Sequence, residues 1–164
     1  MLPRRSFIPT VILTGLLVGT LDIISACTHF MIATGDKSFT KVLVFVASGF
    51  FGKTAFSAGP AMAWWGLLFH YIIAFSFTLL FFLVYPKAPA LRKYPVVTGL
   101  VYGLLVWCAM EFLVLPMSNI PPRHYRIANT VIGISILMVM IGLPLSLVAR
   151  KFYGDGNSGD VIKS

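Results

Sequence analysis

Charged residues are scarce in this sequence, and acidic residues are the scarcest. Charged residues make up 11% of the 164 residues, and Asp and Glu together contribute only five. A soluble globular domain usually carries about 25% charged residues. The shortage argues against an ordinary water-soluble domain and indicates that much of the chain lies in a non-aqueous solvent.

Cysteine is also scarce, and no catalytic motif is present. Cys27 and Cys108 lie inside apolar runs, and their spacing is typical of neither a zinc site nor a disulfide framework. The sequence has no glycine-rich phosphate loop, no nucleophile elbow and no His-Glu-x-x-His motif. Nothing in it supports a hydrolytic or metal-dependent enzyme, and we expect neither a bound metal nor a cofactor.

What the sequence does contain is long apolar runs, over residues 7–33, 61–85, 95–115 and 127–149. Each reaches the roughly 20 residues that a helix needs to cross a bilayer. The runs are continuous rather than alternating, so they predict helices and not the strands of a barrel. We predict an all-α membrane protein in which four transmembrane helices form one domain over residues 1–153, surrounded by the lipid bilayer.

A fifth apolar segment, over residues 38–53, is too short for a full span. At 1.5 Å per residue it extends about 24 Å, and it contains Lys41. We expect a short interfacial or re-entrant helix between the first and second transmembrane helices.

The formal net charge is +8, but the basic residues flank the apolar runs instead of sharing one face. That distribution is typical of membrane insertion and argues against nucleic acid as a partner. The positive-inside rule favours placing both termini in the cytoplasm, including a disordered tail over residues 154–164. The cytoplasmic set is then Arg4, Arg5, Lys87, Arg92, Lys93, Arg150, Lys151 and Lys163, and the outer set is Lys37, Lys41, Lys53, Arg123 and Arg126.

The N-terminus allows a second interpretation. Arg4-Arg5 is typical of a twin-arginine export signal, and Ile24-Ser25-Ala26-Cys27 matches a bacterial lipobox. Cys27 would then be the lipidated first residue of the mature protein, and three spans would remain. The apolar region is longer than an export signal needs and contains Asp22, so we favour the transmembrane helix.

Three ionisable residues lie inside the predicted spans and are the main candidate functional residues: Asp22, His70 and Glu111. A charged residue at mid-membrane costs about 2.5–3.5 kcal/mol, so such residues usually face protein or water and often serve a function. Counting along the helices places Asp22 and His70 near the midplane and Glu111 closer to the outside. We predict that they form a polar cluster, which suits a proton relay or a cation site because histidine titrates near neutral pH. The alternative is that they only join helices through hydrogen bonds.

Three further polar residues lie near span ends. Asn129 could join the cluster or cap its helix, and His29 is the other possible additional member of the cluster. The alternative for His29, as for His124, is a position in water near the membrane surface.

Small residues share a helix face with each member of the cluster. They are Gly15 and Gly19 on the first helix, Gly66 on the second, and Gly99 and Gly103 on the third. Small residues let helices approach closely in lipid, so we predict that these glycines lie at helix contacts and that copies associate as a homo-oligomer. The pattern Thr-Gly-x-x-x-Gly at 14–19 recurs at 98–103, which suggests two related helix pairs.

Gly66-Leu-Leu-Phe-His70, Tyr85-Pro86-Lys87, Gly99-Leu-Val-Tyr-Gly103 and Glu111-Phe-Leu-Val-Leu-Pro116 resemble the YagU-like family of small bacterial inner-membrane proteins. The resemblance covers residues 60–122. It implies a bacterial inner-membrane location and carries over His70 as a matching position, with a polar residue also placed where Glu111 stands. It implies no substrate.

These patterns favour a polytopic membrane protein whose polar cluster handles protons or a small solute. The alternative is a structural or lipid-interacting membrane protein without transport activity. A third interpretation is an intramembrane enzyme using His70 and Glu111, which no motif supports. The identity of a small-molecule ligand does not follow from the sequence.

Overall fold

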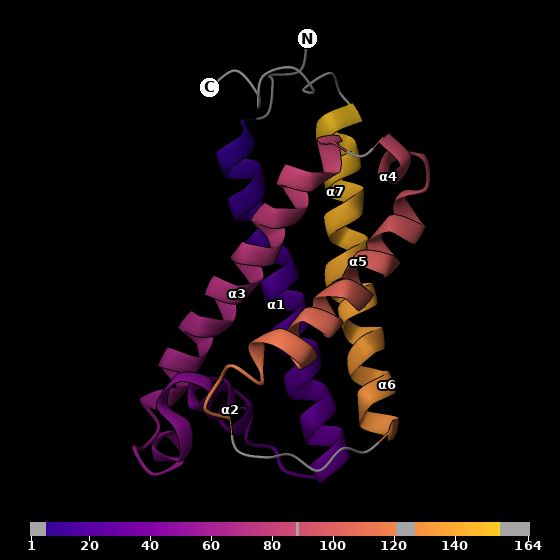
Figure 1. Ribbon diagram of the computed structural model, residues 1–164. Helices are drawn as coiled ribbons and strands as arrows, with labels where there is room; N and C mark the ends of the chain where they lie inside the picture. The colour runs from indigo at the N-terminus through magenta and orange to yellow at the C-terminus, as the bar shows by residue number, and fades with distance from the viewer. Residues whose placement is uncertain (1–5, 88, 121–126, 155–164) are drawn as a thin grey trace.

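Four long helices run the length of the computed structural model, which describes residues 6–87, 89–120 and 127–154 (Figure 1). They are Phe7–Thr34, Met62–Lys87, Pro95–Val114 and Ile127–Gly154, and each is long and apolar enough to cross a membrane. The shortest, of 20 residues, extends about 30 Å, the thickness of a bilayer's hydrocarbon core. The described ranges contain no strand. The predicted all-α fold with four spans is therefore confirmed.

Three of the four long helices are built from more than one helical segment. The first span is the single helix α1 (Phe7–Thr34), and the second is α3 (Met62–Val84) with the 3-10 turn η2 (Tyr85–Lys87). After the short helix α4 (Pro89–Lys93), the third span joins α5 (Pro95–Ala109) to the π-helical turn η3 (Met110–Val114). The fourth joins α6 (Ile127–Ile136), the π-helical segment η4 (Leu137–Gly142) and α7 (Leu143–Gly154).

The predicted short helix between the first two spans is also present. It is α2 (Thr40–Phe51), followed by the 3-10 helix η1 (Gly52–Phe56). Gly35 ends α1 in the left-handed conformation, with φ of 72°, which glycine adopts without steric cost. The chain then turns back so that α2 packs against α3, where Gly66 lies directly on the backbone of Leu43.

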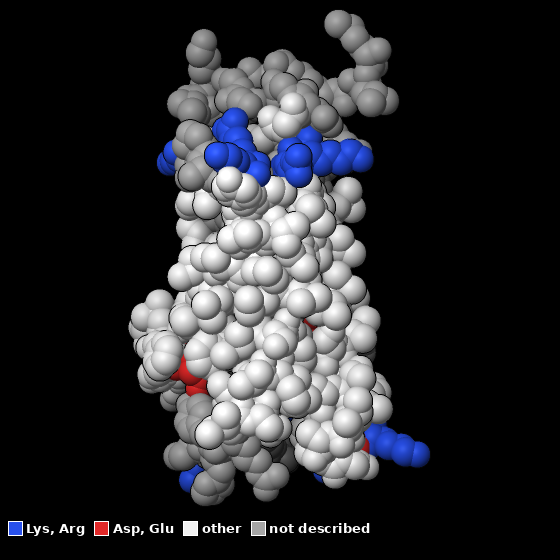
Figure 2. Space-filling model, turned by 90° about the vertical axis from the view of Figure 1, so that its right-hand side faces the viewer, with Lys and Arg blue, Asp and Glu red and all other residues white. Residues whose placement is uncertain are grey.

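The two ends of the molecule differ. α1 begins and α7 ends at one end, called the terminal end here, and α2 lies at the opposite, loop end (Figure 1). Lys and Arg side chains form a band near the terminal end, and below it lies a broad surface on which only small patches of acidic atoms are visible (Figure 2). Large apolar side chains of the spans are exposed, including Leu13 at 67%, Val97 at 58% and Leu105 at 57%. This arrangement suits a surface that faces lipid instead of water.

The main buried core lies in the terminal half. Val18, Phe82, Tyr85 and Leu145 are fully buried in it, and Phe152 is 3% exposed. Two buried tyrosine and serine hydroxyls fasten the spans to one another: Tyr153 Oη donates to the Phe82 carbonyl at 2.6 Å, and Ser146 Oγ to the Pro95 carbonyl at 2.7 Å. In lipid such groups need protein partners, because no water is available to them.

Glycines bring α5 and η4 into backbone contact. A Cβ added at Gly99 would lie 2.6 Å from the Gly142 carbonyl oxygen, and one added at Gly103 would lie 2.6 Å from the Leu137 carbonyl oxygen. Gly15 and Gly19 face α3 instead, against the rings of Phe75 and Tyr71. All of these positions are buried within one copy of the chain. An interface between copies would therefore need other residues.

Proline accounts for the π-helical geometry of η4. Pro144 follows η4 by two residues, has no N–H, and its ring would clash with the carbonyl of Met140 in a regular helix. A local π-helical turn relieves that clash and keeps the surrounding backbone hydrogen bonded.

We expect Gly103→Ala to lower the free energy of unfolding by about 1–3 kcal/mol, because the added methyl would overlap the backbone of η4. Unfolding in mixed micelles titrated with a denaturing detergent measures this. Gly133→Ala is the matched control, since a Cβ there meets no atom within 4 Å. Equal effects of the two substitutions would contradict the close contact.

An ion pair closes the turn between α1 and α2. The ammonium of Lys41 donates to the carboxylate of Asp36, which also accepts the Ser38 N–H at 2.9 Å. These hydrogen bonds, chiefly the one from Lys41, lower the pKa of Asp36 from its usual value of 3.8. Since the folded pKa is the lower one, the stabilisation is complete above the unfolded pKa and is lost as the pH falls through the folded pKa.

The difference in stability between wild type and Asp36→Asn should therefore stay constant from about pH 5 to 8 and shrink as the pH falls below 3.8. Thermal unfolding in detergent across that range measures it. A difference that grows in acid would show that the pair does not stabilise the charged carboxylate.

Candidate functional site

Asp22 and His70 come together between α1 and α3. The Nε2 atom of His70 donates to the carbonyl oxygen of Gly19 at 2.9 Å, since a carbonyl can only accept. This bond fixes the ring, and it leaves Nδ1 as the nitrogen that can accept a proton in the neutral imidazole. Asp22 lies three residues after Gly19 on α1, is half-buried, and interacts electrostatically with His70.

Neighbouring polar and aromatic groups support this pair. The hydroxyls of Tyr71 and Thr20 are hydrogen bonded at 2.8 Å, which joins α3 to α1 one residue from His70. The rings of His70 and Tyr71 are 5.5 Å apart and nearly perpendicular. Contacts of this kind hold the imidazole in one orientation beside the Asp22 carboxyl.

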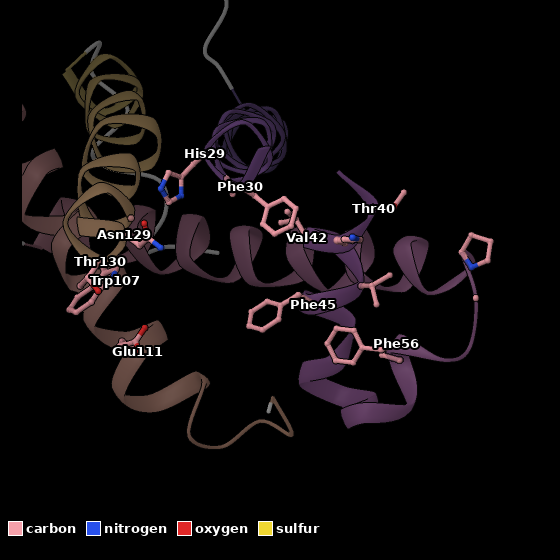
Figure 3. A pocket seen from close by; sticks show the side chains of 17 residues that line it. His29, Phe30, Thr40, Val42, Phe45, Phe56, Trp107, Glu111, Asn129 and Thr130 are labelled. Atoms are coloured by element: carbon pink, nitrogen blue, oxygen red, sulfur yellow. The ribbon is translucent and has the colours of Figure 1, made fainter. Parts of the chain in front are cut away.

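A cavity of about 900 Å³ lies in the loop half of the molecule. One wall is polar: His29, Glu111, Asn129 and Thr130 lie on the same side of the cavity in Figure 3, and Trp107 lines it there too. Across the cavity is an aromatic wall, to which Phe30, Phe45 and Phe56 contribute (Figure 3). A cavity with one polar and one apolar wall suits a small amphiphilic molecule.

The cavity takes in Glu111 but not the other two members of the predicted cluster. Glu111, on the π-helical turn η3, is half-buried in the lining, which includes neither Asp22 nor His70. The Asp22–His70 pair nevertheless lies next to it. Ala26 lines the cavity and stands one turn of α1, about 6 Å along the axis, from Asp22.

His29 is placed differently from what its position in the sequence suggests. One of our two expectations placed it in water near the membrane surface, but it is half-buried in the cavity lining, and its Nε2 is buried without a hydrogen-bond partner among the described residues. The reason is that α2 folds back and builds a wall of the cavity around this turn of α1, so that His29 lines the cavity together with Glu111 and Asn129. His124 lies outside the described residues.

Sequence reasoning missed the aromatic wall. Phe45 lies in the segment 38–53 that we predicted as an interfacial or re-entrant helix, Phe56 follows that segment, and neither was singled out as a lining residue. The combination of Lys41, aromatic residues and glycine turns in a short segment was the available signal. The spacing of Trp107, four residues before Glu111, predicts that the two share one helix face, and both line the cavity.

Cys27 is half-buried in α1, with its Sγ 4.0 Å from the Phe39 carbonyl oxygen. Arg4 and Arg5 lie outside the described residues, as does the tail after Gly154, and the export-signal interpretation stays a prediction. Within the described ranges, no three His, Cys, Asp or Glu side chains lie close enough to hold one metal ion.

No family model matches the chain, and no curated protein or solved structure is significantly similar to it. The resemblance to the YagU-like family therefore stays a prediction. The case for a function rests on the residues and their geometry.

If the cavity is open to water, a cysteine at Gly133 should react with a membrane-impermeant maleimide. Gly133 lines the cavity and has room for a Cβ, and a thiol reacts only where water allows the thiolate to form. Val139→Cys, on the same span and 45% exposed outside the cavity lining, is the control that should stay unlabelled. Both variants carry Cys27→Ser and Cys108→Ser. Equal labelling, or labelling of the control alone, would contradict a water-filled cavity.

Proposed function

We propose that this protein provides a membrane pathway for protons, or for a small solute whose movement is linked to protons. One observation carries the proposal: a carboxyl–imidazole pair lies inside the spans, one helical turn from a cavity with a polar wall. Ionisable residues within membrane spans are costly, and they commonly mark ion or proton pathways.

The role that we assign to the Asp22–His70 pair and to each wall of the cavity follows from the functional groups present there. Asp22 and His70 would exchange a proton, because a carboxyl beside an imidazole whose Nδ1 can accept a proton has two protonation sites within reach. His29 and Asn129, with Glu111, would receive the solute or hydrated proton in the cavity, and the aromatic wall would accommodate an apolar part of the solute.

Location and orientation belong to the same proposal. The basic band at the terminal end favours a cytoplasmic position for both termini, by the positive-inside rule. The cavity would then face the opposite side of the membrane. A bacterial inner membrane follows from the resemblance to the YagU-like family.

A structural or lipid-interacting role without transport is the second candidate. It is favoured by the hydrogen bond from His70 to Gly19, which gives the imidazole a role in joining α1 to α3 without proton movement. Such bonds contribute about 0.6 kcal/mol on average in membrane proteins.

Proton flux into proteoliposomes that contain the purified protein decides between the two. We expect flux driven by a membrane potential, and its loss to the level of protein-free liposomes in Asp22→Asn, because an amide cannot carry the proton. Asp36→Asn makes the same chemical change at the loop end, outside the spans, and should keep the flux.

The variants are compared at equal reconstituted amounts and equal thermal stability. Flux that persists in Asp22→Asn would overturn the role of this carboxyl. Absence of flux in the wild type, both alone and with a panel of small amphiphilic amines and acids on the cavity side, would favour the second candidate.

A further inference from the structure

Basic side chains at the terminal end are gathered from three parts of the chain. Lys87 follows α3, Arg92 and Lys93 belong to α4, and Arg150 and Lys151 lie near the end of α7. Figure 2 shows Lys and Arg at one level near this end, directly beside a broad surface free of basic side chains. None of the three acidic residues that the structure describes, Asp22, Asp36 and Glu111, belongs to these elements.

Two buried polar groups beneath this band have no partner among the described residues. Tyr85 is fully buried, and its hydroxyl makes no hydrogen bond. The Nε of Arg92 is likewise buried and unpartnered, although an Nη of the same guanidinium donates to the Pro86 carbonyl at 2.9 Å. Buried polar groups are nearly always hydrogen bonded in proteins, so two neighbouring exceptions indicate a missing partner.

The charges around these two groups favour an anion as their partner. The Tyr85 hydroxyl lies within electrostatic reach of the guanidinium groups of Arg92 and Arg150, and Arg92 also acts on Tyr153. Both unpartnered groups can donate a hydrogen bond: Arg Nε–H only donates, and the Tyr85 hydroxyl has a free proton. Two donors beside two guanidinium groups form the arrangement that recognises a phosphate.

The apolar side chains around the site favour a phospholipid as the source of such a phosphate. Exposed apolar side chains lie next to the site along the chain, including Leu83 and Val84 before Tyr85 and Val96 and Val97 after Arg92. Acyl chains would lie against these residues while the headgroup meets the basic band. A zwitterionic headgroup would bring an ammonium close to the lysines, which disfavours it relative to an anionic one.

We propose that Tyr85, Arg92 and Arg150 form a binding site for the phosphate of an anionic phospholipid, with Lys87, Lys93 and Lys151 supplying further attraction. Arg92 is half-buried and the other four basic residues are exposed, so the guanidinium links the buried tyrosine to the surface. This site is separate from the cavity and from the Asp22–His70 pair, and it does not depend on the proposed pathway.

Native mass spectrometry of the purified protein, titrated with phosphatidylglycerol or phosphatidylcholine of equal chain length, tests the site. We expect wild type to bind phosphatidylglycerol at least about tenfold more tightly. Tyr85→Phe should weaken phosphatidylglycerol binding by about tenfold, because it removes a hydrogen bond to a charged group and changes no charge. Arg92→Gln should weaken it further.

Lys53→Gln removes a positive charge from the loop end and is the matched control, expected to change binding less than about twofold. Unaltered binding by Tyr85→Phe would overturn the site, since diffuse attraction to the basic band would then account for the preference. Equal affinity of wild type for the two lipids would also overturn it. Should Arg92→Gln fail to fold, the comparison of Tyr85→Phe with wild type still decides.

Soluble anions are the remaining source of phosphate. Inorganic phosphate and glycerophosphoglycerol, which lack acyl chains, are titrated against the wild type already loaded with phosphatidylglycerol. Displacement only at concentrations far above that of the lipid supports a lipid site. Binding of either soluble anion as tightly as the lipid would overturn the assignment to a phospholipid.

Discussion

The backbone contact between α5 and η4 holds the third and fourth spans together, and the other elements of the structure pack around this pair. In a bilayer, apolar surfaces gain little by leaving lipid, so helices associate where their shapes allow very close approach. Gly99, Gly103 and Gly142 provide that approach, each against the backbone of the opposite helix. Hydrogen bonds then extend the unit, from Ser146 to Pro95 and from Tyr102 and Tyr153 to carbonyls of α3.

The two halves of the molecule use polar residues in different ways as a result. The terminal half is filled by aromatic and aliphatic side chains, and its charged residues lie at the surface in the basic band. The loop half contains the cavity, because α2 and η1 stand between α1 and the start of α3 without filling the space toward α6. Half-buried ionisable groups are tolerated there because a cavity of this size can hold water or a solute.

The helix boundaries followed from local properties of the sequence. The run at 7–33 became Phe7–Thr34, and the run at 127–149 became the first part of Ile127–Gly154. Apolar length and glycine spacing act within one helix, so they can be read without knowing its neighbours. The glycines of the repeated Thr-Gly-x-x-x-Gly pattern lie at a helix contact in both places. Gly15 and Gly19 face the second span, and Gly99 and Gly103 face the fourth.

The contacts among the polar residues could not be predicted from the sequence in this way. Counting residues gives the depth of Asp22, His70 and Glu111 along their own axes, but not the rotation and tilt that decide which of them face one another. Asp22 and His70 are neighbours, whereas Glu111 lines the cavity with His29 and Asn129. The aromatic wall depends on α2 packing against α3 at Gly66, a contact between segments far apart in sequence.

The amino-acid sequence was sufficient for the four spans, the short helix after the first, and the identity of the costly intramembrane residues. Each of these follows from the free energy of placing single residues or single helices in lipid. The tertiary structure alone decided that His29 is half-buried, that a cavity exists, and that Tyr85 and Arg92 lie together beneath the basic band. These features arise only when separate helices pack, because a cavity or a shared site depends on the distances between them.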